Sequence, residues 1–259
     1  MLKKILEKLV RWSVKKMART KGGQELLITA LYDFPLISIE SFGRRSSIEM
    51  GFDKVADFPP SIHGFEDLYF LFCCSPLNMG ICALSLDEAA YLYKLVKTLR
   101  QATLVEIGRF KGGGTFILAS AMPADATLLS YDLHVKMPRY FNGKILDDYC
   151  LKVLKRYNLD KRVKILVGDS TKIETSQLSV DFIFFDGDHS YQGIKSDFQN
   201  WFPAAKKGGH LLFHDAARPR PYTTCHEGVL QLIQELEQRY SNELIKVKEI
   251  GSIVHFIKK

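Results

Sequence analysis

The stretch LVEIGRFKGGGT, residues 104–115, decides the fold of this chain. An apolar run of Leu104, Val105 and Ile107 ends at Gly108, and three consecutive glycines then lead into the helix-like sequence FILASAM. A buried parallel strand that feeds a glycine loop and a helix N-terminus brings backbone close to a ligand in α/β proteins. The spacing is E-x-G-x-x-x-G-x-G rather than the G-x-G-x-x-G of dinucleotide folds, which favours a nucleoside cofactor without a pyrophosphate.

Length and composition point to one globular domain with an N-terminal extension. A chain of 259 residues with 46% hydrophobic residues can bury a full core. Neither an apolar run long enough to span a membrane nor an uninterrupted signal-peptide core is present in the sequence. The five cysteines are scattered and form no C-x-x-C pair, which indicates reduced thiols and a cytoplasmic protein.

The net charge of +7 lies almost entirely in the N-terminal segment. Residues 1–25 hold eight Lys and Arg residues against two Glu residues, so the remaining chain is nearly neutral and gives no support for a nucleic-acid partner. Apolar residues of the segment recur at helical spacing. Three interpretations stay open: docking on the chain's own domain or on a second subunit of a homodimer, peripheral contact with an anionic membrane, or disorder.

Strand and helix patterns alternate after residue 85, which predicts a Rossmann-like, doubly wound α/β fold. Ser85-x-x-Glu88 is a capping-box signature for a first helix that runs to about residue 100, and Thr224-x-x-Glu227 is a second one. The strands are expected at 103–108, 127–132, 163–168, 180–186 and 209–214, and the later helices at 113–122, 144–157, 191–200 and 225–239. The tail reads as a hairpin around Gly251-Ser252 that closes a seven-stranded, mostly parallel sheet with an antiparallel final strand. We therefore divide the chain into a helical or lid extension, 1–84, and a main domain, 85–259.

Acidic residues stand at the carboxyl end of every predicted parallel strand. They begin with Glu106 and Asp132 and continue with Asp169, Asp186 and Asp215. Carboxylates gathered at one edge of a sheet repel each other unless something neutralises them, so a cationic ligand or a metal ion is expected there.

The segments EIGRFKGGGT, SYD, VGDS, DFIFFDGDHSY and FHD together resemble a class I S-adenosylmethionine-dependent methyltransferase. The likeness is greatest to the small-molecule O-methyltransferase-like group that carries DGDHSY and FHD, the methyltransferase family 24 type. It covers about residues 85–259, and the closing hairpin matches the antiparallel last strand of that fold.

The resemblance implies a binding site for S-adenosylmethionine along these motifs. The loop residues would wrap the methionine part, Asp132 would hold the ribose, and Asp169 and Ser170 would lie beside the adenine. Helix capping is the alternative role for Asp132 and Asp169. The full set implied to contact the cofactor is Glu106, Gly108, Gly112, Gly113, Gly114, Thr115, Asp132, Asp169, Ser170 and Asp186.

Methyl transfer to a hydroxyl needs an aligned nucleophile and a base for its proton. Asp188 or His189 is the candidate base, because both follow the fourth strand; a local role in the loop is the alternative for each. His214 is a third catalytic candidate, as a base or as a substrate contact that Asp215 orients.

A divalent metal is a further expectation from metal-dependent relatives of this group. Those enzymes place one acid after the fourth strand and a pair of two acids, or of an acid and an asparagine, after the fifth. The corresponding positions here are Asp186 and His214-Asp215. The histidine departs from that pattern and disfavours magnesium, which prefers oxygen ligands.

We therefore expect an enzyme that methylates a hydroxyl of a small molecule, such as a sugar or a natural-product-like acceptor. Two alternatives remain: a methyltransferase that acts on a macromolecule, and a non-catalytic S-adenosylmethionine-binding protein on the same fold.

Overall fold

The computed structural model describes Ser13, Lys16, Thr20, Phe52, Val55 and residues 58–72, 81–134, 143–217 and 226–259. Within the predicted amphipathic N-terminal helix the structure describes only Ser13, Lys16 and Thr20, so the role of this helix stays a prediction. No helix in these ranges is both long and apolar enough to cross a membrane.

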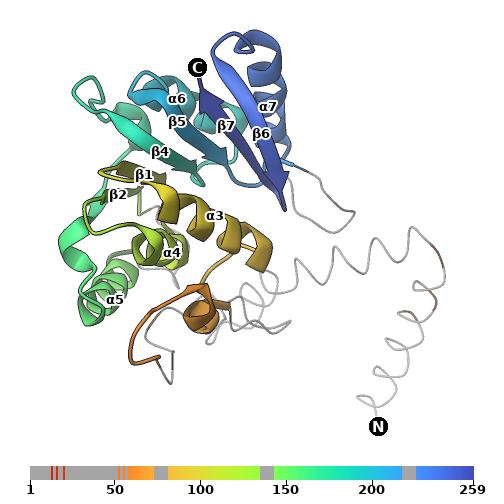
Figure 1. The fold of residues 1–259 in the computed structure, drawn as a ribbon. Helices are drawn as coiled ribbons and strands as arrows, with labels where there is room; N and C mark the ends of the chain where they lie inside the picture. Colours follow the sequence, from red (N-terminus) through yellow and green to blue (C-terminus); the bar gives the residue numbers. More distant parts are fainter. Residues whose placement is uncertain are drawn as a thin grey trace.

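Seven strands form one sheet in the order β3-β2-β1-β4-β5-β7-β6, and β7 runs antiparallel to both of its neighbours (Figure 1). This confirms the predicted Rossmann-like sheet with an antiparallel final strand. The order reverses at β1 and β4, the place where open α/β sheets bind ligands. The strand bounds are β1 Thr103–Ile107, β2 Thr127–Asp132, β3 Val163–Val167, β4 Val180–Phe185, β5 Ala205–Phe213, β6 Leu244–Ile250 and β7 Ile253–Lys258.

Helices alternate with the parallel strands and cover both faces of the sheet. Ser85 caps the helix Leu86–Thr98 (α3) with a complete capping box, as predicted. The Ser85 side chain accepts a hydrogen bond from the Glu88 amide, and the Glu88 carboxylate accepts one from the Ser85 amide. The helices are η3 Phe65–Phe72, α3 Leu86–Thr98, α4 Gly113–Ala121, α5 Gly143–Arg156, η4 Asp160–Arg162, η5 Ser170–Lys172, α6 Tyr191–Trp201 and α7 Glu227–Arg239.

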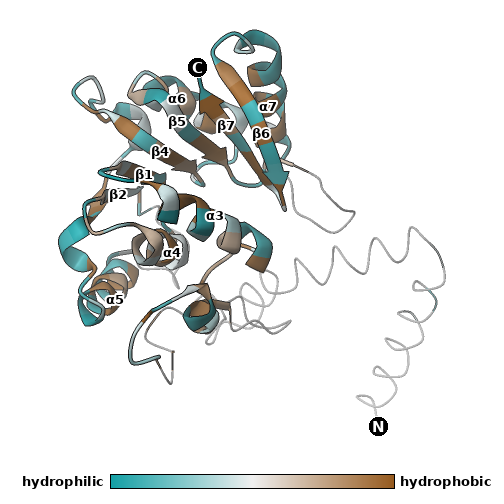
Figure 2. Cartoon of the chain, in the orientation of Figure 1, coloured by the Kyte–Doolittle hydropathy of each residue, from teal (hydrophilic) through white to brown (hydrophobic). Residues whose placement is uncertain are grey.

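The sheet separates two apolar layers, because successive strand residues point to opposite faces. Leu104 and Phe182 pack under α3, α4 and α5, whereas Val105 and Ile183 pack under α6 and α7. The inner strands are largely brown in Figure 2, as expected for strands covered on both sides.

Two boundaries differ from the sequence prediction. Strand β5 begins at Ala205 rather than at residue 209, since its pairing with β4 passes through a bulge around Gly208, whose φ is +78°. Helix α7 begins at Glu227 with His226 as its N-cap, so the capping box predicted from Thr224 is wrong. The His226 amide donates to the Asp215 carbonyl, which fixes where this helix starts.

Candidate active site

The glycine loop joins β1 to α4 at the carboxyl edge of the sheet. Gly108 and Gly112 have φ angles of +89° and +87°, a backbone conformation that favours glycine. A Cβ atom on Gly108 would lie 2.0 Å from the Asp186 carbonyl oxygen, and one on Gly112 would lie 2.6 Å from the Cys150 Sγ atom. Both positions therefore need glycine for conformation and for close contact.

The chain's own atoms account for the two glycines that follow. A Cβ atom on Gly113 would come within 2.7 Å of the Ile81 carbonyl oxygen, and one on Gly114 within 2.7 Å of the Glu106 Oε1 atom. The run of glycines thus lets α4 begin directly against residues 81–82 and against the carboxylate of β1.

Glu106 is a buried acid beneath this loop. Its Oε2 atom accepts hydrogen bonds from the hydroxyls of Thr115 and Ser130, each at 2.5 Å. Burial raises the pKa of Glu106 to about 7, although the two hydroxyls act in the opposite direction. A cation next to the loop would favour the charged form of this carboxylate.

Asp132 organises the loop from the end of β2. Its carboxylate accepts from the backbone amides of Arg109, Phe110 and His134, at 2.9, 3.0 and 2.9 Å. Asp132, which was predicted to bind the ribose, therefore already accepts backbone hydrogen bonds on both carboxylate oxygens. It lies beside the loop that the cofactor would contact.

The buried side chain of Arg109 was missed in the sequence analysis. It forms a bidentate ion pair with Asp147 of α5 at 2.8 Å and donates to the Ser130 carbonyl at 2.7 Å. The His134 Nε2 atom lies 2.5 Å from the Asp147 Oδ2 atom, which also accepts a hydrogen bond from Arg109. These contacts join the glycine loop, β2 and α5, and the position of Arg109 directly after Gly108 was the available signal.

Asp169 and Ser170 follow β3 and have local partners. Asp169 caps η5 by accepting from the Thr171 amide, and its contact with Lys172 lowers its pKa to about 2. The Ser170 hydroxyl donates to Asp197 of α6, whose pKa burial raises to about 6. The predicted contact of these two residues with the adenine stays a prediction.

A cluster of histidines and acids lies where β4 and β5 end. The His214 Nδ1 atom is 2.8 Å from the Asp186 Oδ1 atom and 3.7 Å from the Asp215 Oδ2 atom. The His189 Nε2 atom is 3.3 Å from Asp215 and 3.6 Å from Asp186. The structure thus brings together four residues that the sequence analysis placed at this edge.

Two further members of the cluster were not predicted. His226 stacks on His189 with ring centroids 4.3 Å apart, and its Nε2 atom lies 3.5 Å from Asp215. Glu88 of α3 approaches His214 from the opposite side, with 3.7 Å between its Oε2 atom and the His214 Nε2 atom. The sequence pattern assigns Glu88 only to the capping box of α3. It places the start of the last helix too early, and therefore does not reveal that His226 lies at the sheet edge.

The cluster holds opposite charges side by side. Partial burial opposes ionisation of Asp186, but His214 and His189 outweigh it and lower the Asp186 pKa to about 2. Burial alone would lower the pKa of His189, yet Asp186 and Asp215 raise it to about 9. The same two acids and Glu88 raise the pKa of His214. The neighbouring carboxylates thus favour the charged form of both imidazoles in the ligand-free chain.

Asp188 stands apart from this cluster. Its carboxylate is exposed and accepts from the Ser190 amide at 2.8 Å. Its other oxygen lies so close to Gly193 that a Cβ atom there would come within 2.2 Å of it. These contacts are consistent with the local role at the start of α6, which was the alternative to a catalytic one.

The donor atoms fit a divalent transition metal better than magnesium. Two groups have donor atoms within 4.8 Å of one another, Asp186 with His189 and His214, and His189 with Asp215 and His226. The His189 Nε2 atom is itself buried and has no hydrogen-bond partner among the described residues. Two imidazoles and one carboxylate in each group suit zinc, iron or manganese rather than magnesium, which prefers oxygen ligands.

Comparisons with known proteins agree with this geometry. Residues 105–216 match the family model described as a methyltransferase domain. This stretch is therefore similar to a methyltransferase domain. It has the class I fold, and it includes the glycine loop and the strand-end residues from Glu106 to Asp215.

Individual relatives resemble the methyltransferase domain over part of their length. The caffeoyl-CoA O-methyltransferase of Medicago sativa is 28% identical over 138 residues, which are 51% of each chain. The tapetum-specific methyltransferase 1 of Arabidopsis thaliana is 25% identical over 43% of this chain and 46% of its own length. The chain thus spans about half the length of these curated relatives.

A solved methyltransferase from Geobacter sulfurreducens has the same fold. It superposes with a TM-score of 0.51 at 18% identity, and the alignment covers 68% of this chain and 80% of that one.

Proposed function

We propose that this chain transfers the methyl group of S-adenosylmethionine to a hydroxyl oxygen of a small molecule. The close approach of Gly108 to the Asp186 carbonyl carries this proposal, because it sets the loop for the methyl donor directly against the histidine and acid cluster. A hydroxyl that bound at the cluster would lie next to the cofactor loop. Methyl transfer requires this proximity.

The residues at the carboxyl edge fit a cationic nucleoside cofactor. Glu106 and Asp186 lie on either side of Gly108 and would balance the positive charge of S-adenosylmethionine. When bound, that cofactor supplies an electrophilic methyl group. The loop from Gly108 to Thr115 would hold its methionine part, with Asp132, Asp169 and Ser170 toward the ribose and adenine.

We assign the proton of the acceptor hydroxyl to His189 rather than to Asp188. The His189 ring lies in the cluster between two carboxylates, whereas Asp188 is occupied at the start of its helix. In its neutral form His189 would accept the proton, and Asp186 and Asp215 would stabilise the resulting imidazolium.

A divalent metal at the predicted set Asp186, His214 and Asp215 is a second part of the proposal, although both groups of donor atoms that lie close enough to hold an ion also include His189. When bound, the ion would supply positive charge to the acceptor oxygen, and His189 would then act as a ligand rather than as the base. Three imidazoles around these acids favour a metal that accepts nitrogen ligands.

The acceptor class rests on the O-methyltransferase relatives and on the nearly neutral main domain, which also argues against a nucleic-acid acceptor. A sugar or a natural-product-like hydroxyl compound is the proposed substrate.

Calorimetry with S-adenosylmethionine, followed by transfer of a radiolabelled methyl group across a panel of hydroxylated sugars and aromatics, tests the proposal. Cofactor binding with transfer that His189→Asn abolishes is the expected result. Cofactor binding without transfer to any acceptor, in the presence of zinc or manganese, would support the non-catalytic alternative. Transfer to RNA alone would establish the macromolecular one.

A further inference from the structure

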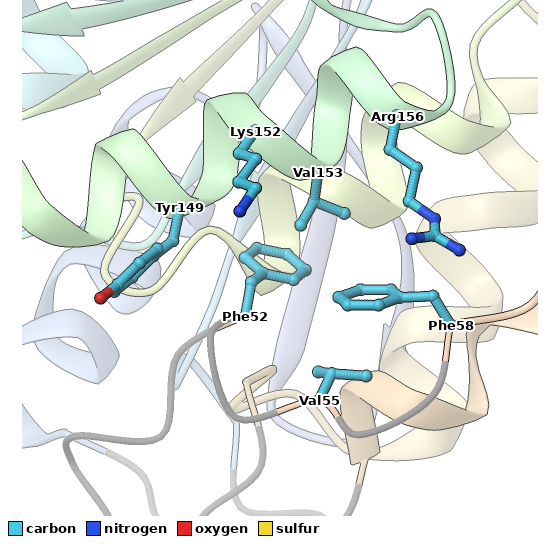
Figure 3. A pocket seen from close by; sticks show the side chains of 7 residues that line it. All are labelled: Phe52, Val55, Phe58, Tyr149, Lys152, Val153 and Arg156. Atoms are coloured by element: carbon cyan, nitrogen blue, oxygen red, sulfur yellow. The ribbon is translucent and has the colours of Figure 1, made fainter.

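A cavity of about 400 Å³ lies between α5 and the segment that contains Phe52, Val55 and Phe58 (Figure 3). These three side chains and Val153 form its apolar wall. The volume falls within the range of about 300–1,000 Å³ that is typical of small-molecule sites. The cavity shares no residue with the strand-end cluster.

Two cations of α5 also line this cavity. Lys152 and Arg156 are one helical turn apart, and Figure 3 shows both side chains directed toward the aromatic rings of Phe52 and Phe58. The Arg156 guanidinium lies 5.1 Å from the centre of the Phe58 ring. Both cations are exposed, so their mutual repulsion across one helical turn is weak, and a bound anion would relieve it.

The acids of α5 are paired elsewhere. Asp147 binds Arg109 and His134, and Asp148 lies 3.3 Å from Lys144. None of the described residues that line the cavity is an acid, and neither Lys152 nor Arg156 forms an ion pair with another described residue. Tyr149 also lines the cavity.

We propose that this cavity binds a small amphipathic carboxylate. An aromatic or aliphatic body would pack against the phenylalanine and valine side chains, and the carboxylate would accept hydrogen bonds from Arg156 and Lys152. The ligand would share a wall with the glycine loop, since Phe52 lies 3.4 Å from the place of a Cβ atom on Gly112 and its ring centre is 5.7 Å from that of Phe116 in α4.

The test compares 2-naphthoic acid with 2-naphthylmethanol, which has the same ring system but no charge. Calorimetry on the full chain measures both affinities, and methyl NMR of Val55 and Val153 reports where the ligand binds. We expect the acid to bind about tenfold more tightly than the alcohol, as for a charge-assisted contact. Equal affinities, or methyl shifts absent from both valines, would overturn the proposal.

Paired variants then separate the two cations from general charge. Lys152→Met combined with Arg156→Met should remove the preference for the acid. Lys155→Met removes one charge from the same helix. Its position is exposed, as those of Lys152 and Arg156 also are, but it does not line the cavity, so the variant should retain the preference. The proposal fails if Lys155→Met weakens the acid as much as the double variant does. Both outcomes are independent of methyl transfer.

Discussion

Gly108 touches the backbone of Asp186, so the glycine loop after β1 and the residues that follow β4 are in direct contact. The amide of Asp186 also donates to the Ile107 carbonyl at 2.8 Å, which holds the two strand ends in register. A change in the conformation of one loop must therefore move the other.

Gly108→Ala should be strongly destabilising, and Gly208→Ala is its matched control. Both glycines have positive φ, which costs alanine about 1–2 kcal/mol. Only Gly108 also has a neighbour in the way, since a Cβ atom on Gly208 would meet nothing within 4 Å. We expect roughly 1–3 kcal/mol of additional loss for Gly108→Ala from the forced displacement. Urea unfolding measures the free energy of unfolding of both variants. If the two variants lose the same amount of stability, the contact with Asp186 does not contribute to the effect.

Glu106→Gln should change how stability depends on pH. The folded pKa of Glu106 is raised to about 7 above the ordinary 4.5, so its protonated form stabilises the fold below pH 4.5, and this stabilisation is lost as pH rises through 7. Glutamine has no such titration. The variant should therefore gain up to about 3 kcal/mol relative to the wild type between pH 4.5 and pH 8, without cofactor.

Unfolding at several pH values gives the difference between the two proteins, which cancels the other titrating groups. The same variant should bind S-adenosylmethionine more weakly at pH 8, where it lacks the negative charge. A constant stability difference across this range would contradict a buried, titrating Glu106.

Methyl transfer in the absence of metal should become faster with rising pH up to about 9. His189 has a raised pKa of about 9, and only its neutral form can accept a proton, so the rate is expected to rise about tenfold per pH unit below that value. His189→Asn should remove both the activity and its pH profile. Asp188→Asn should retain both, and a flat profile for the wild type would exclude His189 as the base.

Divalent cations should differ in how strongly they stabilise the protein, according to the ligands that each cation prefers. Zinc or manganese should raise the midpoint of thermal unfolding, because an ion that binds only the folded state stabilises it by mass action. Magnesium at the same concentration should have little effect. His214→Gln should abolish the shift, whereas His210→Gln, which changes a histidine of β5 outside the two donor groups, should retain it. A larger shift with magnesium than with zinc would refute the assignment.

Periodic sequence patterns predicted the sheet and its helices well. The alternation of apolar runs with capping signals placed α3 to within two residues, and Gly251-Ser252 marked the final hairpin. Local chemistry of this kind depends on neighbours in sequence, which a single chain displays directly.

The cluster was only partly predictable, because its members come from four separate segments. Asp186 and His214 could be placed since strand ends share an edge, but Glu88 reaches His214 from α3, 126 positions earlier in the numbering. His226 depends on where α7 begins, and that is fixed by a long-range bond to the Asp215 carbonyl. No sequence spacing encodes either contact.

The contact of Gly113 with residues 81–82 has a consequence for where this protein can be cut. The Cys82 amide bonds to the Leu71 carbonyl, and Leu68 and Leu71 are fully buried against the same core. Removal of everything before Ser85 would uncover the start of α4 and leave an apolar hollow beside α3. The smallest stable fragment must therefore retain η3. Residues 65–72 and 81–82, which precede the first predicted helix, support the glycine loop by packing against the start of α4.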